Sequence, residues 1–428
     1  MKTRVMAAAY ALLGIAPAGA AAAEAEAPKP SGVNVDASLL YYDEADRITI
    51  VEPVVRMSKE FAEGRELDVL LTVDTISGAT PNGTLPGKPA TVTSPSGGGG
   101  SGASAVGDVP TTKMTDTRYA VDGSWTQPLA ESWKGALGAS VSKEGDYASF
   151  GARTSLAKDL NQKATTLSLG LSGELDQSNP IGGVPTPFGA SLISQGASAD
   201  KTVVGALAGL TQVIDARTLM QLNFLFNVEN GYLNDPYKQL SQVDPVTGVP
   251  QNNIYENRPR SRTGQSFYWL TKHAFATGVA GAAYRYYMDD WGIRSHTVDA
   301  TYNWKYNERG FLEPHFRFYH QSQADFYQLG LINGASLPAY ASADYRLSRF
   351  NAITGGLRWG WRFDNDSQLH LRLEYYTQLG SAHPDSPADI GVQRGFSLFP
   401  KLQATIFQVE YAFNTANIFA AAPDEAHR

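Results

Sequence analysis

The stretch Val279–Tyr306 alternates between apolar and polar side chains with a period of two on both sides of a short turn. After that turn, at Met288–Arg294, one face carries mainly apolar and aromatic residues and the other polar ones: His296, Val298, Ala300, Tyr302, Trp304 and Tyr306 against Thr297, Asp299, Thr301, Asn303 and Lys305. Because strand side chains point to alternate faces, the stretch predicts a long β-hairpin with one apolar and one polar face. Each arm has about ten residues, enough to cross a membrane as a tilted strand.

Similar segments follow one another from Gly32 to Phe413, and about sixteen strands are expected. Every second connection is short, such as Ile214–Arg217 and Asp364–Ser367, whereas the intervening ones include all the long ones, such as Ile76–Met114 and Glu229–Arg262. Tight turns at one end and larger loops at the other are typical of membrane barrels. The pattern therefore predicts an all-β fold, a transmembrane antiparallel up-and-down β-barrel with both termini on the periplasmic side.

The ends of the chain predict export. Residues 1–23 have two basic residues, an apolar run and a small-residue end, which is typical of a secretory signal peptide. Residues 24–31 form a flexible lead, 32–413 the barrel and 414–428 a periplasmic tail, and the Ser/Gly/Pro-rich tract Thr91–Val106 is expected to be mobile. The mature chain has no apolar run near eighteen residues and no cysteine, so spanning helices and thiolate sites are not expected. These features favour the bacterial outer membrane of a Gram-negative cell, reached by the general secretion route.

Aromatic residues gather at predicted strand ends, where membrane interfaces favour rings with a polar edge. Trp125 and Trp133 flank one short turn, and Trp304, Tyr306 and Phe311 gather near another. The last strand alternates through Thr405, Phe407, Val409, Tyr411 and Phe413, and it resembles the aromatic-ended signal that the barrel-insertion machinery reads, although a tail to Arg428 follows it. Outer-membrane lipid and that machinery are therefore expected partners, whereas a net charge of -7 argues against nucleic acid.

The opposite face of the strands is polar and carries both signs of charge. The predicted lumen-lining residues are Arg285, Asp299, Arg317, Arg358, Arg362, Arg372, Glu374 and Glu410. One interpretation is a salt-bridge network that stiffens a wide barrel, and the other is a permeation eyelet or a docking surface for a partner.

The segment Asp74-Thr-Ile-Ser-Gly-Ala-Thr80 follows the third strand. It resembles the Asp-x-x-Ser-Gly-Ala-Thr sequence at which a periplasmic flavin transferase attaches FMN to threonine through a phosphodiester. The resemblance implies covalent FMN on Thr80, recognition of Asp74, and room for the transferase at Gly78 and Ala79, with Ser77 as a further matched position of the sequence. Such chemistry needs a flexible, exposed hydroxyl, which the start of a long loop would supply. The other interpretation is an ordinary turn of small polar residues.

No constellation for catalysis or metal binding emerges from the sequence. The seven histidines show no HExxH spacing, and G-x-S-x-G is absent. His315 and His370 have lumen parity, and we expect them to be solvated or hydrogen-bonded. The sequence therefore predicts no catalytic residue, no metal site and no enzyme.

Three blocks resemble the domain of unknown function 3570 family of exported outer-membrane β-barrel proteins: Lys143–Ser149, Tyr284–Thr297 and Ser342–Arg358. This resemblance implies genes beside a flavin transferase, a thioredoxin-like protein and a small lipoprotein, which are therefore candidate partners. The first functional hypothesis is a non-enzymatic barrel that serves a flavin-linked redox or maturation system across the envelope. The alternatives are a general porin or small-solute transporter, and a structural or adhesive surface barrel.

Overall fold

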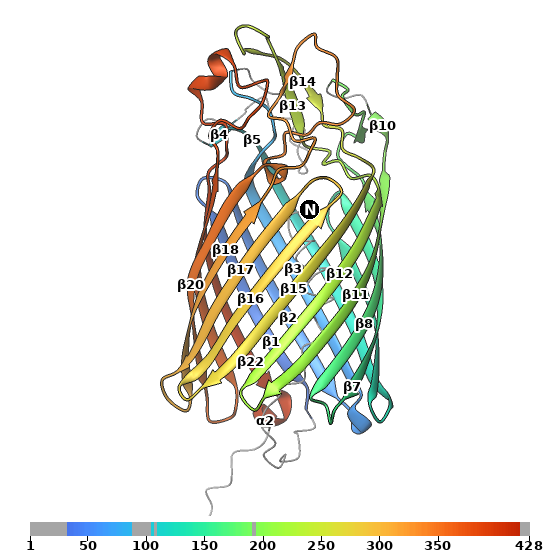
Figure 1. The fold of residues 1–428 in the computed structure, drawn as a ribbon, viewed down its shortest axis with the longest axis vertical. Helices are drawn as coiled ribbons and strands as arrows, with labels where there is room; N and C mark the ends of the chain where they lie inside the picture. The colour runs from blue at the N-terminus through green and yellow to red at the C-terminus, as the bar shows by residue number, and fades with distance from the viewer. Residues whose placement is uncertain (1–31, 88–103, 107–108, 191–193, 420–428) are drawn as a thin grey trace, which may run out of the picture.

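The computed structural model describes residues 32–87, 104–106, 109–190 and 194–419, and these form a closed antiparallel β-barrel (Figure 1). The main sheet has 17 strands, of which β4 pairs only with β5, so that sixteen strands make the ring. The ring closes where β1 pairs with β22, for example at Leu39 and Val409. The predicted fold class and strand number are confirmed.

The ring strands follow chain order: β1 (Asn34–Glu44), β2 (Ile48–Glu60), β3 (Glu66–Pro81), β5 (Val109–Ala130), β6 (Trp133–Lys143), β7 (Tyr147–Leu160), β8 (Thr165–Ser178), β11 (Ala199–Asp215), β12 (Thr218–Gly231), β15 (Ser261–Phe275), β16 (Gly278–Asp289), β17 (Arg294–Lys305), β18 (Gly310–Gln321), β20 (Phe350–Arg362), β21 (Gln368–Gly380) and β22 (Leu402–Asn414). Shorter strands are β4 (Ser104–Val106), β9 (Val184–Pro185), β10 (Ser194–Gly196), β13 (Gln239–Val243), β14 (Pro250–Tyr255) and β19 (Leu331–Ile332). The helical pieces are η1 (Ala62–Gly64), η2 (Tyr345–Leu347), η3 (Gly391–Gly395) and α2 (Thr415–Phe419). Among the described residues, no helix is both long enough and apolar enough to cross a membrane.

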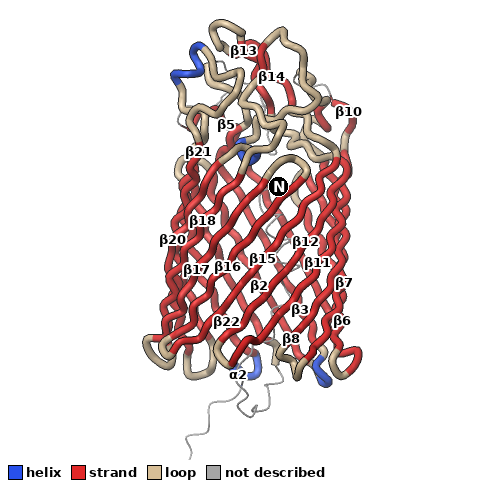
Figure 2. Tube along the Cα trace, in the orientation of Figure 1, coloured by secondary structure: helices blue, strands red, loops and turns tan. Residues whose placement is uncertain are grey.

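Short turns join the strands at one end of the barrel, whereas the other end carries all the long connections together with three short ones, 45–47, 144–146 and 290–293 (Figure 2). We call these the short-turn end and the outer end. The helix α2 and the start of β1 both lie at the short-turn end, where the backbone N–H of Thr415 donates to the carbonyl of Val33 at 2.9 Å. The alternation of short and long connections that the sequence predicts is therefore confirmed.

The outward face of the ring is apolar. Leucine, valine and aromatic side chains alternate along the strands and remain exposed, and Leu169 at 64% and Tyr119 at 63% are examples. So much exposed apolar surface would be unfavourable in water but suits the hydrocarbon of a bilayer.

Aromatic residues lie near the short-turn end, and most of them are on the outward face. The ring planes of Trp359 and Trp361 stack with centroids 6.3 Å apart, and Nε1 of Trp359 donates to the hydroxyl of Tyr306 at 2.9 Å. Phe311 differs from the prediction, because its ring packs on His370 inside the barrel with centroids 5.6 Å apart. Phe311 is the second residue of β18. Because side chains alternate along the strand, it points to the face opposite that of the outward Phe316 and Phe318.

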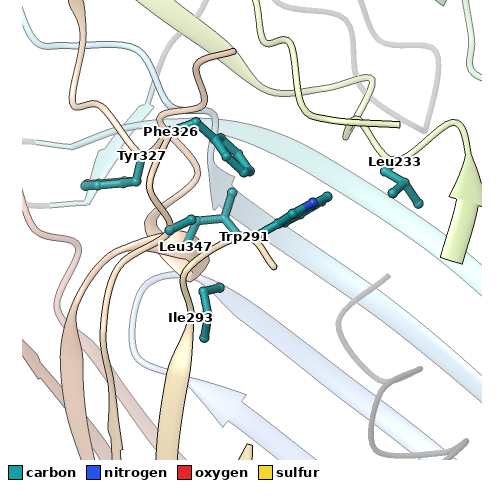
Figure 3. Packing of buried hydrophobic residues seen from close by; sticks show 7 residues of the cluster. Leu233, Trp291, Ile293, Phe326, Tyr327 and Leu347 are labelled. Carbon is teal, nitrogen blue, oxygen red and sulfur yellow. The ribbon is translucent and has the colours of Figure 1, made fainter. Parts of the chain in front are cut away.

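The long connections and the short turn 290–293 fold into a compact layer at the outer end, which we call the outer cap: residues 82–87, 232–260, 290–293, 322–349 and 381–401 (Figure 1). The fully buried apolar clusters of the described chain lie mainly here. In Figure 3, Trp291 and Phe326 meet edge to face with centroids 5.0 Å apart, near Leu347. The strand β13 pairs with β14 and also, in parallel, with β19 from another connection. Loops that are far apart in sequence thus share one core.

The strands β3 and β5 extend into the predicted long connection Ile76–Met114. β3 continues to Pro81 instead of ending near Thr75, and β5 begins at Val109 instead of near Thr115. The signal peptide, the flexible lead, most of the tract Thr91–Val106 and the last residues of the tail lie outside the described residues.

Candidate functional site

The polar face of the ring forms the wall of a lumen, and its charges are paired between adjacent strands. Nε of Arg118 on β5 lies 2.5 Å from Oδ2 of Asp74 on β3. Nε of Arg317 on β18 lies 2.7 Å from Oδ2 of Asp299 on β17. Pairing lowers the free energy cost of holding charges against a wall of low dielectric constant.

Some pairs reach across a whole strand, and a glycine on that strand makes room for them. Asp122 on β5 pairs with Arg153 on β7, and Gly138 of β6, the strand between them, is opposite Arg153 in the register. A Cβ on Gly138 would lie 2.7 Å from the guanidinium carbon of Arg153. These glycines therefore shape the wall without contributing a functional group.

His315 of β18 also makes an ion pair across a neighbouring strand, at a position where that strand has a glycine. Its Nδ1 lies 2.8 Å from Glu374 Oε1 on β21, across Gly356 of β20, and its Nε2 lies 3.0 Å from Asp299 Oδ2. His315 thus bridges two carboxylates. The same wall continues through His370, whose Nδ1 lies 3.0 Å from Glu410 Oε1.

The remaining predicted lumen residues are less tightly paired. The guanidinium of Arg285 lies over the ring of Tyr268, 5.5 Å from its centroid, and makes no ion pair with another described residue. Nε of Arg372 is 3.9 Å from Glu374 Oε1. One guanidinium nitrogen of Arg358 is 3.7 Å from Glu313, and another is 3.0 Å from Nδ1 of His370. Arg362 is the last residue of β20 and is exposed. Arginines in these positions bring positive charge to the lumen wall.

The strands β8, β11 and β12 face the lumen mainly with small, uncharged or amide side chains along their middle. Serines of β8 lie opposite glycines of β11, and the pairs are Ser168 with Gly209 and Ser172 with Gly205. In the closed ring, β8 and β11 lie across from β21 and β22. The lumen thus has a charged sector, β18 to β22, opposite a small-residue sector, β8 to β12.

A second cluster of charges is buried in the outer cap. Arg258 lies 2.7 Å from Glu256 and 2.9 Å from Asp344, and all three side chains are almost fully buried. Arg346 pairs with Asp344 and also with Asp235, 2.6 Å away. We call these five residues the cap latch, because they join the connection 232–260 to the connection 322–349.

The pKa values in the cap latch follow from burial and from the neighbouring cations. Although burial alone would raise it, the charges of Arg346 and Lys238 lower the pKa of Asp235 to about 2. By the same balance, the pKa of Asp344 lies well below its ordinary value. For Glu256 burial prevails over the nearby Arg258, and its pKa is raised. Two of the three carboxylates of the cap latch therefore resist protonation.

The segment that resembles a flavin acceptor is part of strand β3. The prediction that it opens a flexible loop is wrong, because Gly78 pairs with Met114 and half-buried Thr80 with Thr112. Gly78 has a φ of 131°, and a Cβ there would lie 2.0 Å from the carbonyl oxygen of Arg47. Asp74, four residues before Gly78, is held in the lumen by Arg118 and is not presented in a groove. Ser77 is exposed on the opposite face of the strand.

Sequence reasoning missed the cap latch. The composition of the long connections could have indicated it. They mix acidic and basic residues with leucine, isoleucine and aromatic residues, and such a composition can form a folded core. It also missed three carboxylates near the outer rim, those of Asp116, Glu144 and Asp146, which have oxygens within 4.8 Å of one another. Burial raises the pKa of Asp146, whose carboxylate accepts a hydrogen bond from the hydroxyl of Tyr237.

The chain was compared with protein-family models, curated protein sequences and solved structures. A family model described as "Protein of unknown function (DUF3570)" matches residues 2–413. No curated protein sequence matches the chain. Among solved structures, the chain is similar to a ferric enterobactin receptor (PfeA) mutant from Pseudomonas aeruginosa, with a TM-score of 0.41 and 9% identity over 82% of this chain and 55% of that chain.

Two further solved structures are similar at the same level. The TodX deltaS2S3 mutant, a monoaromatic hydrocarbon channel, has a TM-score of 0.40 and 10% identity over 91% of both chains. CdiB from Acinetobacter baumannii has a TM-score of 0.47 and 8% identity over 89% of this chain and 60% of that chain. The chain spans about half the length of the receptor chains that it matches.

Proposed function

The chain belongs to the protein family of unknown function DUF3570, and from that premise we propose that it is a non-enzymatic outer-membrane channel for small polar solutes. In this proposal the lumen conducts the solute and the outer cap covers the mouth that faces the outside. An export signal and the general secretion route, as the sequence predicts, would bring the chain to that membrane.

The wall of the barrel is the observation that carries the proposal. Its outward face is apolar, as hydrocarbon requires, while its inward face carries both signs of charge in ordered pairs. Barrels of about sixteen strands are wide enough to leave an aqueous channel. Water and small polar solutes are therefore the contents that such a lumen favours.

Conductance across planar lipid bilayers tests the proposal. Purified protein should give stable current steps, and Arg285→Glu should shift the ion selectivity towards cations, since it reverses a charge on the lumen wall that has no paired carboxylate. The matched control is Arg217→Glu, the same charge change on an exposed turn at the short-turn end. A barrel that inserts and never conducts would contradict the proposal.

A second candidate, a flavin-linked redox or maturation role, is favoured by the segment Asp74–Thr80 and by the family resemblance. In the folded barrel, Thr80 lies within a paired strand, so covalent attachment of FMN would have to precede folding. The periplasmic flavin transferase, the thioredoxin-like protein and the small lipoprotein would then be partners in this role.

Mass spectrometry of the barrel from cells with and without the transferase tests this second role. An FMN-sized addition on Thr80 that depends on the transferase and disappears in Thr80→Val would support it. The control is Thr75→Val, an outward-facing threonine of the same strand. An unmodified Thr80 in both strains would refute it.

A further inference from the structure

Four polar side chains interrupt the lipid-facing surface on β16, β17, β18 and β20, which lie side by side on the near face of the barrel in Figure 1. The register pairs Tyr286 with His296, His296 with His320, and His320 with Asn351. The next row on the same face, towards the short-turn end, is more apolar: Tyr284, Val298, Phe318 and Ile353. The polar interruption is therefore one row high and four strands wide.

Each of the two imidazoles in this row, those of His296 and His320, makes one hydrogen bond through Nδ1. The hydroxyl of Tyr284 lies 2.7 Å from Nδ1 of His296, and Nδ1 of His320 lies 2.8 Å from the amide oxygen of Asn351. The two imidazole rings stack with centroids 6.4 Å apart. These contacts engage one nitrogen of each imidazole, and among the described residues Nε2 has no hydrogen-bond partner in either ring. Both rings can therefore bind a further group.

Two arginines stand next to the polar row on the outer side. Arg294 is the first residue of β17, two before His296, and Arg349 is two before Asn351. Both side chains are exposed, and neither makes an ion pair with another described residue. Because the strands are about 4.8 Å apart, two arginines separated by one strand can reach a single anion.

The acidic residues near these arginines lie in the turns above the row. Asp290 accepts a hydrogen bond from the backbone N–H of Thr263 at 2.9 Å, and Asp325 lies against Gly292. The row itself lies one to three residues inside the outer strand ends, which is within about 8 Å of those ends along the axis of a tilted barrel. In a barrel whose strands cross a bilayer, the strand ends lie at the level of the lipid headgroups, where charged side chains are tolerated.

We propose that this surface binds the phosphorylated headgroup of an outer-leaflet lipid. The phosphate lies between Arg294 and Arg349, whose planar guanidinium groups donate paired hydrogen bonds to phosphate oxygens. His296, His320 and Asn351 hydrogen-bond the polar groups below the phosphate, and the acyl chains lie along the apolar row beneath them. The site rests on the proposed outer-membrane location, but it is separate from the lumen.

Native mass spectrometry of the detergent-solubilised barrel with added diphosphoryl lipid A tests the site. Wild type should bind one lipid preferentially, and Arg294→Ala with Arg349→Ala should weaken binding at least about tenfold, which corresponds to 1.4 kcal/mol or more. The corresponding Arg→Lys double variant should retain part of the binding. The control, Lys113→Ala, removes an exposed cation from the same rim on β5 and should leave the affinity unchanged.

Three results would overturn the site: equal binding of dephosphorylated lipid A, full competition by millimolar inorganic phosphate, or no loss in the double variant. The second would identify free phosphate as the ligand instead of a lipid. Folding of each variant is checked by heat-modifiable migration on gels. Channel conductance is measured in parallel, so failure of the lipid site is distinguished from failure of the proposed channel.

Discussion

At the scale of single residues, the ion pairs that reach across a strand of the lumen wall depend on the space that a glycine leaves on that strand. Gly356 lies between His315 and Glu374, and a Cβ on it would lie 2.4 Å from Cγ of Glu374 and 2.6 Å from the carbonyl oxygen of Leu373. One of these neighbours is backbone, which cannot move aside as a flexible side chain can. Alanine at this position should therefore be strained.

We predict that Gly356→Ala destabilises the barrel by about 1–3 kcal/mol, as overpacking of a well-packed site usually does. Gly355→Ala is the matched control, because nothing lies within 4 Å of a Cβ on Gly355. Both variants gain the same intrinsic preference of alanine over glycine in a strand, so their difference isolates the clash. The measurement is the urea midpoint of the barrel in lipid vesicles, and equal midpoints would disprove the prediction.

The cap latch has a predictable dependence on pH. The pKa of Asp235 is lowered to about 2, and that of Asp344 lies well below its ordinary value. Their stabilisation is therefore present above the unfolded pKa of about 3.9 and is lost as pH falls through the folded values. The raised pKa of Glu256 acts in the opposite direction, since its protonation on acidification relieves a cost.

We therefore expect the cap to stay closed between pH 7 and pH 5 and to loosen only below about pH 4. Hydrogen exchange of residues 232–260, corrected for the intrinsic pH dependence of exchange, is the measurement. Loosening already at pH 6 would show that other groups control the cap.

At the scale of elements, the cap behaves as a folded unit made of separate connections. Asp344 is central, because it contacts Arg258 and Arg346 from two connections and is 1% exposed. Asp344→Asn should cost the cap about 3–5 kcal/mol, the usual effect of breaking a buried pair. Since 1.4 kcal/mol is a tenfold change, the open fraction should rise about a hundredfold or more.

Protease cleavage within residues 232–260 measures this opening, and it should accelerate strongly in Asp344→Asn. The control is Asp385→Asn, which changes an exposed carboxylate of the same cap. If both variants are cleaved at the wild-type rate, the cap latch does not hold the loops together.

The elements also show what a single sequence can predict. Alternation with a period of two predicts each ring strand, because lipid and water impose opposite demands on its two faces. The cap was not predicted, since its core joins Leu240 of one connection to Leu331 of another, and no local pattern encodes that contact. The extension of β3 through Thr80 was missed because small residues and Gly78 suggested a turn where partner strands continue the ladder.

At the scale of the whole molecule, closure depends on a pairing between the two ends of the chain. Leu39 of β1 is opposite Val409 of β22, and opposite residues in antiparallel strands have Cα atoms about 4.5–5.5 Å apart, within disulfide range. The natural chain contains no cysteine, so two introduced cysteines can pair only with each other within the molecule.

We predict that Leu39→Cys with Val409→Cys forms a disulfide in the inserted barrel and changes migration on non-reducing gels after boiling. The control is Leu39→Cys with Phe413→Cys, because Phe413 is opposite Val35 and therefore four residues further along the strand. Failure of the first pair, or equal reaction of both pairs, would refute the closing register.

The two unlike sectors of the lumen would affect how a solute moves through the proposed channel. Ionised groups of β18 to β22 face mainly glycine, serine and amide groups of β8 to β12. The electric field inside the pore therefore has a component directed across the bore as well as along it. If the barrel conducts as proposed, a solute with a strong dipole should turn as it enters and pass with its charged end along one side.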